Sequence, residues 1–70
     1  MTEYEDIECF LIGLRPQAIR IRVGDDDHWI PRACIEDGGT DADIAWDRDG
    51  WGVEITVSVA AWKARQEGLI

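Results

Sequence analysis

The chain has 70 residues, of which fifteen are Asp or Glu and seven are Lys or Arg, so its formal net charge is −8. This length predicts a single domain spanning residues 1–70. A negative field of this size repels phosphate backbones and anionic membrane surfaces and attracts basic protein surfaces, so we expect no direct nucleic-acid or membrane binding. The alternative is that the acidity only keeps a small protein soluble.

The cysteine content and the N-terminal residues predict a reducing compartment. Cys9 and Cys34 are too few for a disulfide scaffold, and residues 1–6 lack the basic region and apolar run of a signal peptide. No stretch approaches the roughly 20 apolar residues that cross a bilayer. We therefore expect a cytoplasmic protein with two free thiols.

The first half of the chain predicts antiparallel strands. Residues 1–6 are expected to be a loose acidic start, and residues 7–14 form an apolar run whose length suits a strand. Pro16 breaks that run, because proline cannot donate to a strand ladder. Residues 18–23 then alternate β-branched residues with Arg20 and Arg22, which is typical of a half-buried strand.

The second half predicts two more strands and a helix. After a turn at residues 24–27, residues 28–35 are read as a third strand, in which Pro31 predicts an edge position or a bulge instead of a central strand. Residues 36–50 are dense in Asp and Gly and predict a loop, with a short strand possible at 44–46. Residues 51–57 alternate again, and a helix over 59–67 would be capped by Ser58 and ended by Gly68, with Leu69 folding back onto it.

These elements predict an α+β fold. The sheet would be a small antiparallel meander or half-open barrel of four or five strands, closed by one C-terminal helix. Trp29 and Trp51 are expected at or near inward positions. The predicted core consists of Ile19, Ile21, Val23, Val53, Ile55, Val57 and Trp62.

Searches for catalytic and metal-binding patterns give negative results. His28 follows three aspartates and has no neighbouring nucleophile in sequence, so we interpret it as a solvated turn residue. Aligned with a calcium-binding EF-hand loop, Gly50 would put Ala45 and Thr56 where acidic ligands are required. Gly38 and Gly39 precede no lysine that could meet a phosphate. We therefore expect no enzymatic activity, no metal and no cofactor.

The acidic residues are the positive signal. In residues 41–49 an aspartate stands at every second position except Ala45, so an extended chain would place i and i+2 carboxylates about 6.6 Å apart on one side, comparable with successive phosphates of a nucleic-acid strand. Trp46 lies among them and is the candidate apolar anchor, since tryptophan is enriched at interface hot spots. The candidate partner-binding residues are Asp25, Asp26, Asp27, Asp41, Asp43, Trp46, Asp47 and Asp49.

Two segments resemble a pattern of small phage and prophage proteins. The first is Trp29-Ile30-Pro31-Arg32, and the second is the end of the chain, a tryptophan-containing helix followed by Gly68-Leu69-Ile70. The resemblance covers roughly residues 18–35 and 51–70. It departs at residues 33–34, where Ala-Cys replaces the usual serine, and at residues 59–60, where Pro-Glu is commoner. In size and charge the chain is similar to anti-CRISPR proteins, a likeness that transfers no functional residue.

The resemblance implies an inhibitor that binds a basic nucleic-acid-handling protein. The expected target is a CRISPR surveillance complex, whose DNA-contacting surface the acidic residues would occupy as a nucleic-acid mimic. The alternative is a phage accessory module that joins a replication or packaging assembly through its sheet face. A mimic requires its carboxylates on one contiguous face, whereas a module requires an exposed apolar patch. We expect a monomer in either case.

Overall fold

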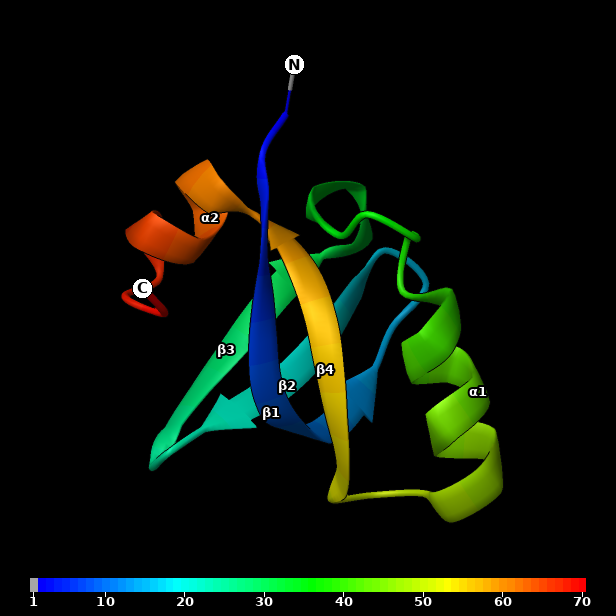
Figure 1. The fold of residues 1–70 in the computed structure, drawn as a ribbon. Helices are drawn as coiled ribbons and strands as arrows, with labels where there is room; N and C mark the ends of the chain where they lie inside the picture. The colour runs from blue at the N-terminus through cyan, green and yellow to red at the C-terminus, as the bar shows by residue number, and fades with distance from the viewer. Residues whose placement is uncertain (1) are drawn as a thin grey trace.

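The structure is a computed structural model that describes residues 2–70, and it contains one four-stranded antiparallel sheet and two α-helices (Figure 1). The strand order is β3-β2-β1-β4. The elements are β1 (Tyr4–Leu14), β2 (Ala18–Val23), β3 (Asp26–Pro31), the 3₁₀ turn η1 (Arg32–Cys34), α1 (Thr40–Asp49), β4 (Val53–Ala60) and α2 (Ala61–Gln66). The α+β class, the antiparallel sheet, the edge position of Pro31 and the C-terminal helix are confirmed.

The strand register divides the sheet into two different faces. Leu11 of β1 lies opposite Ile21 of β2 and Val53 of β4, and Ile19 lies opposite Ile30 of β3. These residues share one face, which packs with residues of α1 and α2 to form the core. The alternate residues of each strand lie on the other face, which we call the open face because much of it remains exposed to solvent.

The core is mainly aliphatic, and most of its sequence-predicted members are correct. Ile19, Ile21 and Val57 are buried, and the predicted residues that pack partly against the cluster are Val23, Val53 and Ile55. The prediction for Trp62 is wrong, because its side chain is exposed on α2. The helix instead packs through Ala61 and Ala64, whose small side chains allow a six-residue helix to lie close to the sheet.

The largest difference from the sequence prediction is α1, which occupies most of the predicted loop over residues 36–50. Asp37 caps it: the carboxylate accepts hydrogen bonds from the backbone N–H of Gly39 at 2.7 Å and of Asp41 at 3.0 Å. The helix ends at Gly50, which has a positive φ of 76°. Only Ala42, Ala45 and part of Trp46 face the core, so the apolar stripe is short and easily overlooked.

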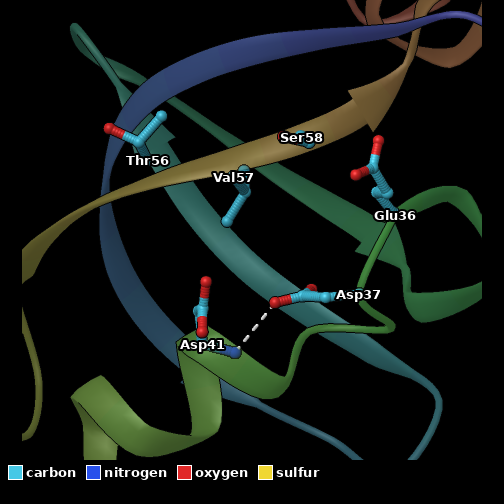
Figure 2. Close-up of a pocket in the computed structure, with 6 residues that line it drawn as sticks. All are labelled: Glu36, Asp37, Asp41, Thr56, Val57 and Ser58. Carbon is cyan, nitrogen blue, oxygen red and sulfur yellow. Dashed lines mark hydrogen bonds between the residues drawn. The ribbon is translucent and has the colours of Figure 1, made fainter.

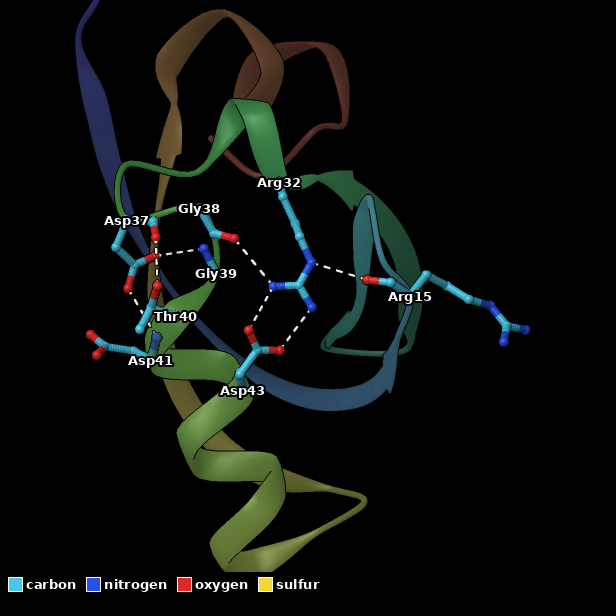
Figure 3. Close-up of polar contacts among 8 residues, drawn as sticks. All are labelled: Arg15, Arg32, Asp37, Gly38, Gly39, Thr40, Asp41 and Asp43. Carbon is cyan, nitrogen blue, oxygen red and sulfur yellow. Dashed lines mark hydrogen bonds and ion pairs between the residues drawn. The ribbon is translucent and has the colours of Figure 1, made fainter.

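Arg32 fixes α1 against the rest of the fold (Figure 3). Its Nη1 and Nη2 donate to the two carboxylate oxygens of Asp43 at 2.9 and 2.8 Å, its Nε donates to the carbonyl of Arg15 at 3.0 Å, and Nη1 also donates to the carbonyl of Gly38 at 3.2 Å. One guanidinium therefore joins the β1–β2 turn, the turn before α1 and α1 itself. These hydrogen bonds lower the pKa of Asp43 below its ordinary value.

Four other boundaries or roles differ from those predicted. Residues 4–6 are not loose but extend β1, with Tyr4 opposite Ala60 of β4, while Met1 lies outside the described residues. The third strand ends at Pro31, after which the chain turns into η1. Ser58 lies within β4 and donates to Asp6 at 2.6 Å instead of capping a helix. His28 lies in β3, with its Nδ1 3.1 Å from a carboxylate oxygen of Glu67.

The end of α2 follows the sequence prediction. Gly68 adopts a positive φ of 75°, and the N–H of Leu69 donates to the carbonyl of Ala64 at 2.8 Å. Leu69 packs against the core as expected for a residue that closes a helix end. Within residues 2–70 no helix is long and apolar enough to cross a membrane.

We predict that Asp43→Asn lowers the free energy of unfolding by about 1 kcal/mol at pH 7, since it weakens a charge-assisted bidentate contact that is half exposed to solvent. Because the pKa of Asp43 is lowered in the folded protein, this stabilisation is present above the ordinary carboxyl pKa and is lost as the pH falls through the folded value. Urea unfolding at pH 7 and in acid measures both effects. Asp47→Asn, on an exposed position of the same helix, is the control and should change little.

We predict that Cys9 is unreactive in the native protein. It is buried, and desolvation raises the pKa of its thiol to about 12, so very little thiolate exists near pH 8. Alkylation followed by peptide mass spectrometry should modify Cys9 only as fast as the fold opens, and at once in guanidinium. Rapid labelling of Cys9 in the native protein would contradict the buried position.

Candidate binding surface

The open face carries exposed aromatic side chains among its charged residues. Phe10 is 44% exposed, Trp29 is 43% exposed and Trp51, in the turn before β4, is 65% exposed. Phe10, Ile12, Arg22 and Trp51 line a shallow hollow beside Gly24 and Gly52. Ile12 is only 8% exposed, so an apolar residue is buried at the surface of this face. Exposed aromatic clusters of this kind are typical of binding surfaces.

Three of the chain's seven basic residues lie against these aromatic rings. The guanidinium carbons of Arg15 and Arg20 lie 5.8 and 5.7 Å from the centre of the Trp29 ring, and that of Arg22 lies 5.8 Å from the Trp51 ring. Such cation–π contacts hold the rings and the charges in fixed relative positions. This half of the face is therefore both aromatic and basic.

Asp27 partly neutralises the arginines. Its carboxylate lies 3.1 Å from Nη2 of Arg20 and accepts a 2.7 Å hydrogen bond from Nε of Arg22. The hydrogen bond with Arg22 lowers the pKa of Asp27 and raises that of Arg22, so both groups stay charged. Three arginines against Asp27 and the nearby Asp25, whose charge also acts on Arg22, leave this half of the face with a small positive excess, in a protein whose net charge is −8.

The other half of the open face is acidic. Glu8 lies opposite Thr56, and Glu54 lies opposite Phe10, so the two glutamates sit diagonally on neighbouring strands and line a common hollow. Neither takes part in an ion pair within the part of the chain that the structure describes. Asp6 adds a third carboxylate further along β1. Like charges on neighbouring strands lower the stability of the fold. A cationic group bound to this half would relieve that repulsion.

A bulge and a glycine near the end of β1 shape the basic half. The register shifts between Leu11 and Gly13, which leaves Ile12 as the extra residue. A Cβ on Gly13 would lie 3.2 Å from Cβ of Arg20 and 3.8 Å from the Trp29 ring. The glycine therefore lets Arg20 and Trp29 lie close over β1, which a larger residue would obstruct.

The aspartates predicted as a partner-binding set are divided between two places. Asp25, Asp26 and Asp27 lie at the β2–β3 turn, and the others lie on α1, away from that turn on the far side of β4 (Figure 1). Because a helix turns by about 100° per residue, Asp41 and Asp43 project to opposite sides instead of forming the strand-like row that their spacing suggested. The structure therefore does not bring this set onto one face.

Several of these aspartates already have cationic partners. Asp27 and Asp43 pair with the arginines described above, and Asp49 lies 2.7 Å from Nε of Arg48. Asp25, Asp26, Asp41 and Asp47 are exposed and make no ion pair with any residue from 2 to 70. These four are the carboxylates that remain available to a basic partner.

The tryptophans are placed almost oppositely to the sequence prediction. Trp46, the predicted exposed anchor, is partly buried and packs against the core from α1. Trp29, Trp51 and Trp62, predicted at or near inward positions, are all exposed. Arg20 of β2 lies opposite Trp29 of β3, so the two side chains share the outer face. The alternation of arginines in residues 18–23 was therefore the sequence signal for the position of Trp29.

A third hollow lies between the start of α1 and β4 (Figure 2). It is lined by three carboxylates, those of Glu36, Asp37 and Asp41, together with residues 56–58 of β4. Asp37 is committed to capping α1, as Figure 2 shows for its bond to the Asp41 N–H. Among residues 2–70 no group of three or more His, Cys, Asp or Glu is arranged to hold a metal ion. We therefore interpret this hollow as part of the structure that begins α1 and not as a binding site.

Comparison of the chain with models of known protein families, with curated proteins and with solved structures finds no match. The arrangement of side chains is therefore the basis for every functional statement below. Of the surfaces described, the open face alone combines exposed aromatic rings, arginines held against them and unpaired carboxylates.

We predict that the two tryptophans Trp46 and Trp51 contribute unequally to stability. Trp46→Ala should lower the free energy of unfolding by about 2 kcal/mol, because it removes a ring packed against the core. Trp51→Ala should change it by less than about 1 kcal/mol, because that ring is largely in solvent. Denaturant unfolding followed by circular dichroism compares the two, and equal losses would show that one ring is misplaced.

Proposed function

We propose that this protein is a protein-binding module that acts through the open face of its sheet. The observation that supports this proposal is the cluster of exposed aromatic side chains, Phe10, Trp29 and Trp51, with arginines stacked on two of them. Aromatic and arginine side chains dominate the energy of protein interfaces, because they bury a large area at a small cost in side-chain freedom.

The surface is suited to binding more than to chemistry. The hollow beside Trp51 is shallow, and its only ionisable group is Arg22, which is committed to Asp27 and to the ring. A partner that covers the open face would remove water from the three aromatic rings together. The gain in free energy would come from that burial, with the charged residues around it deciding the orientation of the partner.

A second candidate function keeps the acidic aspartates as the binding element. The four exposed, unpaired carboxylates, Asp25, Asp26, Asp41 and Asp47, and the net charge of −8 favour an inhibitor that occupies a basic surface of a nucleic-acid-handling protein, as an anti-CRISPR protein would. Their separation into two groups is the reason that we rank this candidate second. A target of this kind would have to meet the β2–β3 turn or α1, not both through one flat surface.

Photo-crosslinking distinguishes the two candidates. We predict that a photoreactive phenylalanine derivative at position 51 gives cross-linked polypeptide in cells that produce the chain. The same residue at position 62, an equally exposed tryptophan on α2, should give little product and serves as the control. The same photoreactive residue at position 47 tests the acidic surface of α1. Products from position 47 and none from position 51 would overturn the sheet-face module in favour of the acidic inhibitor.

A further inference from the structure

The open face has a charge pattern that runs along β1. Phe10 lies at the middle, in one cross-strand row with Arg22 of β2 and Glu54 of β4. Toward the N-terminal end of β1 lie Glu8, two residues away, and Asp6, four residues away. Toward the C-terminal end lie the remaining arginines, with Arg20 opposite Gly13 and Arg15 just after the strand. Acid and base are thus separated on either side of Phe10.

We infer that the partner of this face is a second copy of the same chain, related by a two-fold axis that crosses the strands near Phe10. The inference rests on the proposed function and names its partner. The rotation turns the basic half of one copy onto the acidic half of the other, and it does so twice, as an isologous interface requires. Arg20 then approaches Glu8 of the second copy, Arg15 approaches Asp6, and the two Phe10 rings meet at the axis.

The spacing on the strands matches this arrangement. Two residues of a strand span about 6.6 Å, so Glu8 and Arg20 lie at similar distances on opposite sides of the Phe10 row. Glu8 has no cationic partner within residues 2–70, and the Arg20 side chain, which contacts Asp27 through Nη2, is 43% exposed. Glu8 therefore has bonding capacity that the single copy leaves unused, Arg20 is accessible to a second copy, and Trp29 and Trp51 flank the contact.

Other partners fit the face less well. A polyanion would meet Glu8 and Glu54 on the same surface and the field of a protein of charge −8. A strongly basic partner would meet the three arginines. A second copy matches the apolar cluster and brings Glu8 to Arg20 and Asp6 to Arg15, while Arg22 and Glu54, which share the Phe10 row, meet their own copies at the axis.

We predict that the purified full chain dimerises in sedimentation equilibrium, measured between about 1 µM and about 1 mM in about 0.15 M salt, where screening limits the repulsion of two acidic molecules. Glu8→Arg alone and Arg20→Glu alone should each weaken self-association at least about tenfold, because each reverses a charge at two symmetric contacts. Mixing the two variants should restore dimers, since in the mixed dimer every reversed charge faces its reversed counterpart.

Matched controls separate the contact from net charge. Asp47→Arg and Arg48→Glu make the same charge changes on exposed positions of α1 and should leave association near that of the wild type. Glu8→Arg lowers the net negative charge, so weaker association in that variant cannot come from general repulsion. If Arg20→Glu does not fold, because it loses Asp27 and the Trp29 ring, Arg15→Glu mixed with Asp6→Arg takes its place.

The results test the second copy as the partner separately from the protein-binding function. A chain that stays monomeric up to the highest concentration, or a mixture of variants that does not recover dimers, overturns the second copy as partner. If position 51 then cross-links to a different polypeptide, the protein-binding function still stands. If position 51 gives no cross-link and the chain is monomeric, both are overturned. A position-51 product of twice the 7.9 kDa chain mass supports both.

Discussion

The position of α1 depends on one guanidinium group. Arg32 follows the last residue of an edge strand and reaches the β1–β2 turn, the turn at Gly38 and Asp43 on α1, so it sets how the helix lies against the sheet (Figure 3). Gly39 shows how closely the parts approach, because a Cβ there would lie 2.9 Å from the guanidinium nitrogen. With few large apolar residues of its own, α1 needs this polar anchor to cover the core.

Covering one face of the sheet leaves the other face bare. A chain of 70 residues supplies only two short helices, and both pack on the same side, through small residues such as Ala42 and Ala64. Most of the buried aliphatic residues of the strands pack on that side. The aromatic residues Phe10, Trp29 and Trp51 consequently fall on the solvent side, where arginines stack on the two tryptophans. The exposed aromatic surface and the small core therefore both follow from the packing of the helices on one face of the sheet.

The sequence predicted the sheet much better than the helix or the surface. Residues 18–23 alternate β-branched and charged residues, so both strand and inward face followed from their periodicity. The helix α1 did not, because its apolar residues Ala42, Ala45 and Trp46 are few and its aspartates read as a loop. The sequence signals for this helix were Gly39 and Gly50 at its ends, the acidic residues of its first turn and Arg48 in its last turn.

The candidate surface was missed for a related physical reason. Hydrophobicity alone assigns a tryptophan to the core, whereas the strand register assigns Trp29 to the same face as Arg20. The even spacing of the α1 aspartates carried meaning only for an extended chain, and the ion pair of Asp43 with Arg32 depends on a contact between residues eleven positions apart. Pairings of that kind follow from the three-dimensional packing and not from local pattern.

The distribution of the indole rings also affects how this protein looks in solution. Trp51 and Trp62 are 65 and 56% exposed and Trp29 is 43% exposed, whereas Trp46 packs against the core. The intrinsic emission of the folded chain should therefore be red-shifted, near that of an unfolded polypeptide, and should change little when denaturant is added. A spectroscopist who relied on that emission would judge a well-folded protein to be disordered, whereas backbone circular dichroism would reveal the sheet.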